Sequence, residues 1–184
     1  KYCGVKYAVA FSSGTAALHG ACAVANIGKG DEVIVPTYTF VASANCVVYC
    51  QGTPVLVDVD PSTFCIDPQK VLKKITKKTK ALISVDFAGR AADYGSLLKI
   101  IKKNKLILIE DASQALGGLW KGKGIGSYAD MTIFSLHPVK SITTGEGGIV
   151  ATNDRDYYDK LKRFRSHGIV KTQRDGPWYQ EMQN

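Results

Sequence analysis

One lysine is notable for the residues around it. Lys140 lies in the segment SLHPVKSITTGEGG (135–148), where a strand end is followed by a turn and a glycine-rich return. Small and apolar neighbours would desolvate its ammonium group, and desolvation favours the neutral amine. A neutral amine is the nucleophile that forms an imine with an aldehyde. We therefore predict a covalent role for Lys140, with an ordinary surface lysine as the competing interpretation.

An acidic pair, Glu110-Asp111, ends a strongly apolar run and is followed by ASQA. A carboxylate is costly to bury there unless it has a cationic partner. A protonated pyridine nitrogen would be such a partner, and the carboxylate would keep that nitrogen protonated so that the ring can accept electrons. The alternative is that Asp111 caps a following helix.

A turn of small residues, SSGTAAL (12–18), separates the apolar run 7–11 from the alanine- and leucine-rich stretch 16–26. A helix that begins here presents unpaired backbone N–H groups and the positive end of its dipole, which suits a phosphate. Serine and threonine also cap helices that bind nothing, so a purely structural turn is the alternative.

Strands and helices that alternate along the chain would position these three segments. Short runs rich in valine and isoleucine predict six strands, at 32–36, 53–59, 80–86, 106–111, 131–136 and 147–152. Helix signals lie between them, at 16–26, 39–45, from Asp67-Pro68, at 96–103, and from Asn153-Asp154 to Arg165. This alternation predicts an α/β fold with a mostly parallel sheet and helices on both faces. Such sheets bind ligands beyond the carboxyl ends of their strands.

Composition narrows the classes of function. The chain has 45% hydrophobic and 22% charged residues, as in an ordinary soluble domain. Its net charge of +8 comes largely from the lysine runs at 73–80 and 99–105, which have no interleaved aromatic residues and predict solvated faces rather than nucleic-acid binding. No membrane helix or signal peptide is apparent, so we expect a cytoplasmic protein.

Five cysteines form an odd set without the paired CxxC spacing of a zinc site. Cys46 and Cys50 are four residues apart and would share a helix face, but no histidine or acidic ligand accompanies them. We predict free thiols that act as small core residues, and no metal site.

In this order, four motifs resemble those of the DegT/DnrJ/StrS family of fold-type-I sugar aminotransferases, which use pyridoxal 5'-phosphate. They are SGTAAL (13–18), PTYTFVASAN (36–45), EDASQALG (110–117) and SLHPVKSITTGEGG (135–148). The match spans nearly the whole chain, and the joint pattern is far more specific than any one part. The resemblance implies the large, cofactor-binding domain of a fold-type-I transferase.

The resemblance also implies roles for individual residues. Lys140 would hold the cofactor as a Schiff base, and Asp111 would contact the pyridine nitrogen. Gln114 would lie on the side of the ring hydroxyl, and Phe40 would stack on the ring face.

The phosphate and the substrate would contact a second set of residues. Ser135 and the backbone around Gly14 and Thr15 would hold the phosphate. Ser13 and His137 would lie on the substrate side.

The motif SLHPVKSITTGEGG and two further segments, VDFAG (85–89) and FRSHGIVK (164–171), are similar to the transaminases of the pseudaminic acid pathway. This similarity implies transfer of an amino group from glutamate to C4 of a UDP-linked 4-keto-6-deoxy sugar, for bacterial cell-surface glycans, by a homodimer. Alternatives are a different nucleotide keto sugar, or a truncated or non-catalytic fragment that binds the cofactor. Dehydratases of the family carry a histidine in place of the lysine, so Lys140 argues against them.

Family members are longer at both ends. We therefore expect residues 1–165 to form the large domain without its N-terminal part. The polar tail 166–184 has no apolar period and would lead to an absent C-terminal small domain.

Overall fold

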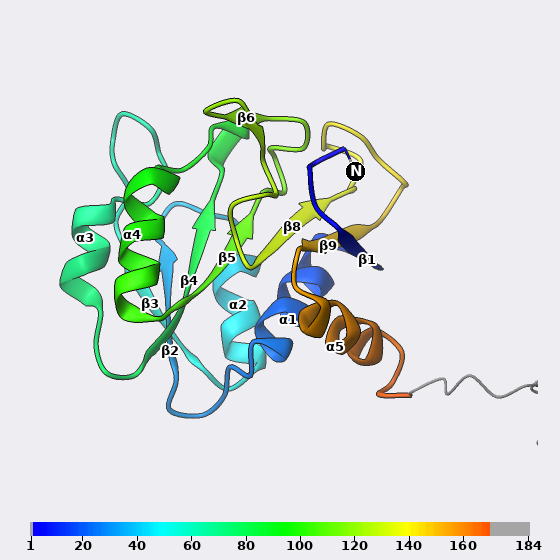
Figure 1. Ribbon diagram of the computed structural model, residues 1–184, viewed down its shortest axis with the longest axis horizontal. Coiled ribbons are helices and arrows are strands. Elements are labelled where there is room, and N and C mark those ends of the chain that lie inside the picture. Colours follow the sequence, from blue (N-terminus) through cyan, green and yellow to red (C-terminus); the bar gives the residue numbers. More distant parts are fainter. Residues whose placement is uncertain (1, 170–184) are drawn as a thin grey trace, which may run out of the picture.

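The fold is built on a seven-stranded sheet, and the computed structural model describes residues 2–169 of the chain. The strand order is β1-β9-β8-β5-β4-β2-β3 (Figure 1). The strands are β1 (Tyr7–Phe11), β2 (Glu32–Pro36), β3 (Thr53–Val57), β4 (Thr79–Val85), β5 (Ile107–Asp111), β8 (Met131–Ser135) and β9 (Gly148–Thr152). A separate antiparallel hairpin consists of β6 (Leu119–Trp120) and β7 (Lys123–Gly124).

Most of the sheet is parallel. Strands β8, β5, β4, β2 and β3 run in one direction, and β9 is antiparallel to both of its neighbours, β8 and β1. The predicted mostly parallel α/β fold is therefore confirmed. All six predicted strands form, with ends that differ by at most two residues. The edge strand β1 is not among them, because only Val9 of its five residues is buried and its apolar signal is short.

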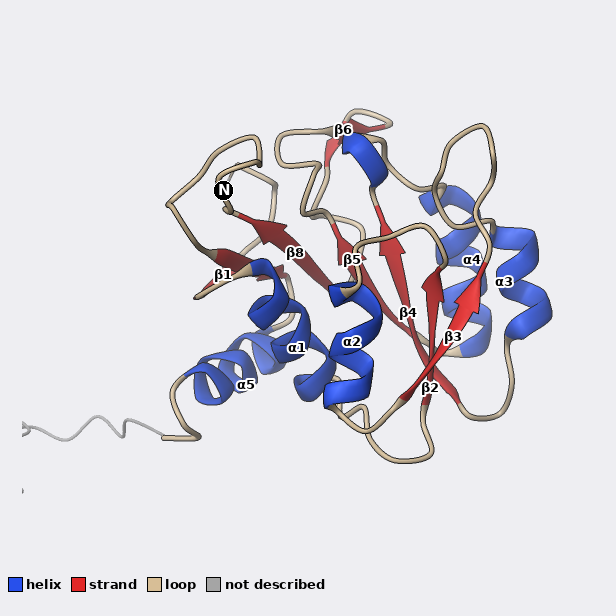
Figure 2. Cartoon of the chain, turned by 180° about the vertical axis from the view of Figure 1, so that it is seen from behind, coloured by secondary structure: helices blue, strands red, loops and turns tan. Residues whose placement is uncertain are grey.

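Helices cover both faces of the sheet, as predicted. Helices α1 (Gly14–Val24), α2 (Ala42–Tyr49) and α5 (Arg155–Arg165) lie on one face, and α3 (Pro68–Lys74) and α4 (Tyr94–Asn104) on the other (Figure 2). A short 3₁₀ turn, η1 (Phe87–Gly89), follows β4. Helix α2 begins and ends later than the predicted 39–45, which leaves Thr39 and Phe40 in the loop before it.

Two apolar clusters hold these layers together. Along β2, Val33 and Val35 pack under α1 and α2, whereas Ile34 faces α3 and α4. Successive side chains of a strand point to opposite faces, and a central parallel strand buries both sets. The sheet is thus fixed from both sides, which holds the ends of its strands in place.

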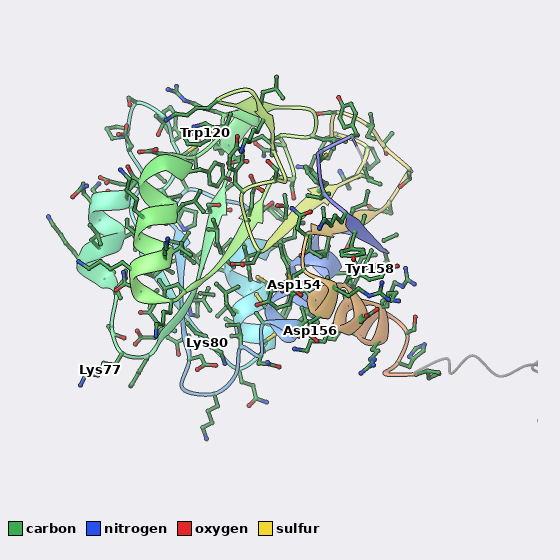
Figure 3. All side chains as sticks on the ribbon, in the orientation of Figure 1. Lys77, Lys80, Trp120, Asp154, Asp156 and Tyr158 are labelled. Atoms are coloured by element: carbon green, nitrogen blue, oxygen red, sulfur yellow. The ribbon has the colours of Figure 1, made fainter. Side chains whose placement is uncertain are left out.

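Aspartate caps begin three of the helices, with Asp93 as the cap of α4. The Asp67 side chain accepts from the Gln69 amide at 2.8 Å, with Pro68 in the first helical turn. The Asp154 side chain accepts from the Asp156 amide at 2.7 Å, at the start of α5 (Figure 3). The helix predicted from Asn153-Asp154 to Arg165 is confirmed, and residues 170–184 of the predicted polar tail lie outside the described residues.

The lysine runs and the cysteines lie where their residue types suggest. Lys77 extends away from the fold into solvent, whereas Lys80 forms an ion pair with Asp31 at 2.8 Å (Figure 3). All five cysteines are free thiols, and Cys22, Cys46 and Cys65 are buried in the core. Within residues 2–169 no helix has the length and apolar character to cross a membrane.

Candidate active site

A cavity of about 470 Å³ opens beyond the carboxyl ends of β4, β5 and β8, beside the start of α1. This is the edge at which parallel sheets bind ligands. The structure places all nine predicted site residues on its wall: Ser13, Gly14, Thr15, Phe40, Asp111, Gln114, Ser135, His137 and Lys140. Segments separated by more than a hundred residues in the chain thus meet at one site.

The start of α1 forms one side of the cavity. Ser13 is its N-cap, with Oγ accepting from the Ala16 amide at 3.1 Å, and the first turn contains no acidic residue. A Cβ on Gly14 would lie 3.0 Å from Cβ of Ser135, so glycine allows α1 to approach β8 closely. The helix end therefore presents free N–H groups and a positive dipole to the cavity, a suitable site for a phosphate.

Asp111 lies on the floor and is 6% exposed. Its Oδ2 accepts from the Ser43 hydroxyl at 2.7 Å, and its Oδ1 accepts from the Ser113 amide at 3.2 Å. No helix begins after Asp111, so the helix-capping alternative is wrong. None of the described lysine, arginine or histidine side chains forms an ion pair with it. A buried carboxylate with two donors and no cation fits a cationic ligand group.

Gln114 connects the floor to the turn after β4. Its Oε1 accepts from the Ala88 amide at 2.7 Å. Ala88 has φ of +53°, a left-handed conformation that is unusual for alanine, and the hydrogen bond helps to hold it. The amide nitrogen of Gln114 makes no further hydrogen bond within residues 2–169, so it is available as a donor to a ligand.

Lys140 lies in a loop that is held by local hydrogen bonds. The Leu136 amide donates to the Gly147 carbonyl at 2.9 Å, and the Lys140 amide donates to the His137 carbonyl at 2.9 Å. Lys140 is half-buried, but residues 137–139 and 141–146 are exposed, including Val139 at 78% and Ile142 at 57%. The prediction that small and apolar neighbours desolvate Lys140 is wrong for this chain by itself, because the loop projects beyond the sheet.

Phe40, His137 and Ser135 line other parts of the cavity. Phe40 is 73% exposed, just before α2. His137 Nε2 lies 3.7 Å from Glu146 Oε1, and both side chains are exposed. Ser135 is buried, and its Oγ accepts from the His137 amide at 3.4 Å.

The sequence analysis missed Thr39 and Ser43. The Ser43 hydroxyl is fully buried, donates to Asp111 and lies 2.7 Å from Thr39 Oγ1. The two residues are four apart within PTYTFVASAN, a spacing that brings side chains together at a helix start. That spacing was the available signal, but nothing in it identified Asp111 as the acceptor.

Comparisons with known proteins identify the family of the chain. The family model of the DegT/DnrJ/EryC1/StrS aminotransferase family matches residues 1–183. A GDP-perosamine synthase of Caulobacter vibrioides is 47% identical over 173 residues, which cover 94% of this chain and 47% of that protein. The chain spans about half the length of the curated relatives it matches.

Solved structures also match. Helicobacter pylori PseC, described as an aminotransferase of pseudaminic acid biosynthesis, is 38% identical, with a TM-score of 0.87 over 93% of this chain and 46% of that one. The PMP form of a sugar aminotransferase, Spr1654 of Streptococcus pneumoniae, is 34% identical, with a TM-score of 0.86 over 91% and 48%. The chain belongs to the DegT/DnrJ/EryC1/StrS family of pyridoxal-phosphate-dependent sugar aminotransferases.

Proposed function

We propose that this chain is the cofactor-binding part of an aminotransferase that moves an amino group from glutamate to a nucleotide-linked keto sugar. The observation that carries the proposal is the convergence of Lys140, Asp111 and the start of α1 on one cavity. Each of the three supplies a different interaction: an amine, a buried negative charge and an anion site. Pyridoxal phosphate has an aldehyde, a ring nitrogen that binds a proton, and a phosphate to match them.

Each residue of the cavity would have a separate role in binding this cofactor, which supplies the electron sink when it is bound. Asp111 holds a proton on the ring nitrogen, oriented by Ser43. The backbone of Gly14 and Thr15, with Ser135, binds the phosphate. Lys140 attaches the cofactor covalently.

Two more side chains orient the ring, and Lys140 has a second task. Phe40 would cover one face of the ring, and Gln114 would donate to the ring hydroxyl. As a free amine, Lys140 would move the proton at the substrate carbon.

Ser13 and His137 are proposed to contact the substrate. For the sugar, we propose a UDP-linked 4-keto-6-deoxy sugar, because the motifs around Asp86 and Lys140 resemble the pseudaminic acid transaminases. A GDP-linked sugar is the second candidate, since the relative that is 47% identical is named a GDP-perosamine synthase.

We also propose that residues 1–165 are the large domain, that further sequence completes the sugar pocket, and that the working unit is a homodimer. The support is twofold. The curated relatives are about twice as long as this chain. Exposed apolar side chains also line the cavity at Phe40 and Val139, and Val41 and Ile142 are exposed in the same two segments. Apolar surface of this kind marks interaction sites.

The test is the half-reaction with the donor. The chain is loaded with pyridoxal phosphate and mixed with glutamate, and 2-oxoglutarate formation is followed together with the cofactor absorbance. We expect stoichiometric conversion in the wild type and none in Lys140→Ala. In a second step, this chain is fused to the C-terminal half of a relative. UDP-linked and GDP-linked keto sugars are then supplied to the fusion in parallel. Failure of glutamate to convert the loaded wild type would contradict the proposal.

A further inference from the structure

Two carboxyl groups, those of Asp86 and Glu110, are completely buried in the layer behind Asp111. Both residues are 0% exposed. Asp86 follows β4, and Glu110 precedes Asp111 in the neighbouring strand β5. Because side chains alternate along a strand, Asp111 faces α2 while Glu110 faces the α4 side. The proposed function makes no use of this pair.

Each carboxyl group has one satisfied oxygen and one oxygen without a partner. Asp86 Oδ1 accepts from the Ala92 amide at 2.9 Å and from the Tyr94 hydroxyl at 2.7 Å. Glu110 Oε2 accepts from the Thr132 hydroxyl. Asp86 Oδ2 and Glu110 Oε1 are buried and have no hydrogen-bond donor within residues 2–169. Unsatisfied buried oxygens are costly, and one proton held between two carboxyl groups removes that cost for both.

The surroundings favour such a proton. Burial raises the pKa of both carboxyl groups, and the charge of Glu110 raises the pKa of Asp86 further, to about 8. The two carboxyl groups also interact with each other, which favours a single proton held by the pair. None of the described lysine or arginine side chains pairs with either acid. The titratable and polar groups that face the pair are neutral hydroxyls and thiols: Tyr94 of α4, Ser84 of β4, Thr132 of β8, Tyr128, Cys3 and Cys65.

The pair is connected directly to the site. The Asp86 amide donates to the Asp111 carbonyl at 3.1 Å, and Asp86 forms part of the cavity wall. Glu110 is bonded to Asp111 in the chain. Repulsion between two ionised carboxylates would push apart the strand ends that set the position of Asp111.

We propose that Asp86 and Glu110 share one proton, and that the protonated pair is a positioning device that holds the carboxyl ends of β4 and β5 together beneath Asp111. The shared proton is a property of the apo chain. Its effect on cofactor binding rests on the proposed function, so the two parts are measured separately.

Isosteric variants provide a matched comparison. In the wild type the pair carries one negative charge at neutral pH and two at high pH. Glu110→Gln and Asp86→Asn each leave a single carboxyl group, with an amide donor beside it. The remaining group loses the like charge and gains a hydrogen bond, so it ionises at lower pH and the pair never reaches two charges.

The first readout uses no cofactor. Trp120 makes an edge-to-face contact with Tyr94, with ring centroids 5.8 Å apart, and Tyr94 donates to Asp86. The chain has two tryptophans, so Trp178→Phe leaves Trp120 as the reporter. We expect its fluorescence to titrate with a midpoint near pH 8, as for Asp86, and the midpoint to fall by at least about one pH unit in Glu110→Gln.

Asp130→Asn is the control. Asp130 is another carboxyl group whose pKa is raised by desolvation, and its side chain accepts from the Leu108 amide, outside the pair. Its replacement should leave the midpoint unchanged. Absence of a midpoint near pH 8 in the wild type, or an unchanged midpoint in Glu110→Gln, would overturn the shared proton.

The second readout is the dissociation constant of pyridoxal phosphate at pH 7 and pH 9.5. For each variant, the dissociation constant at pH 9.5 is divided by that at pH 7. The titration of the cofactor itself affects this ratio equally in all variants, so it cancels when their ratios are compared. We expect affinity to weaken about tenfold more in the wild type than in Glu110→Gln. Equal ratios would overturn the positioning role while leaving the shared proton intact. A chain that shows the Trp120 titration but binds no cofactor would instead contradict the proposed function.

Discussion

Asp111 and Lys140 face the same cavity, but the chain supports them in different ways. Asp111 ends a strand buried on both faces and receives hydrogen bonds from Ser43 and Ser113. Lys140 lies in a loop that makes only local hydrogen bonds and whose residues on either side of Lys140 are exposed. The chain therefore builds the electrostatic part of the site by itself. The dry surroundings that would favour a neutral Lys140 have to come from something that covers the loop.

The largest expected effect is at Asp111. Asp111→Asn keeps the shape of the side chain and removes its charge, so the cofactor nitrogen loses the group that keeps it protonated. We expect conversion by glutamate to slow at least about a hundredfold, measured by stopped-flow absorbance. Ser113→Ala is the control, because Ser113 contacts Asp111 through its backbone amide only. A near-normal rate in Asp111→Asn would show that Asp111 does not supply the electrostatic part of the site, and the contrast with the Lys140 loop would be lost.

Ser43 should have an intermediate effect. Ser43→Ala deletes a buried hydroxyl that donates to the Asp111 carboxylate, and hydrogen bonds to charged groups contribute about 1.5–3 kcal/mol. We expect cofactor affinity to fall roughly tenfold or more, measured by equilibrium titration. Ser43→Cys preserves the size of the side chain and should restore little. If both variants bind as tightly as the wild type, Asp111 does not depend on this support.

The exposed loop should give the smallest effect on the chain itself. Val139→Ser and Ile142→Ser replace solvent-facing apolar side chains, so the free energy of unfolding should change by less than about 0.5 kcal/mol. Association between chains should weaken, as measured by sedimentation velocity. Unaltered association in the double variant would argue against a partner that covers this loop.

Sequence patterns predicted the strands well because each central strand is a short valine- and isoleucine-rich run between polar turns. They also predicted which residues gather at the cavity, since in a parallel sheet the carboxyl ends of the strands meet at one edge. They failed for β1, which buries only Val9 and is held at the sheet edge by its pairing with β9. They failed at Lys140 as well, because local apolar neighbours do not imply burial when a loop leaves the sheet. The Ser43–Asp111 and Asp86–Glu110 pairs join segments distant in the chain, and no single window contains them.

The most direct test of the account is the identity of the lysine that the cofactor modifies. The chain is incubated with pyridoxal phosphate, reduced with borohydride, digested and mapped by mass spectrometry. In the wild type we predict one stoichiometric adduct, on the peptide that contains Lys140. In Lys140→Arg we predict no adduct on the corresponding peptide. An adduct on another lysine, or adducts spread evenly over the exposed lysine runs, would contradict the claim that this cavity is the active site.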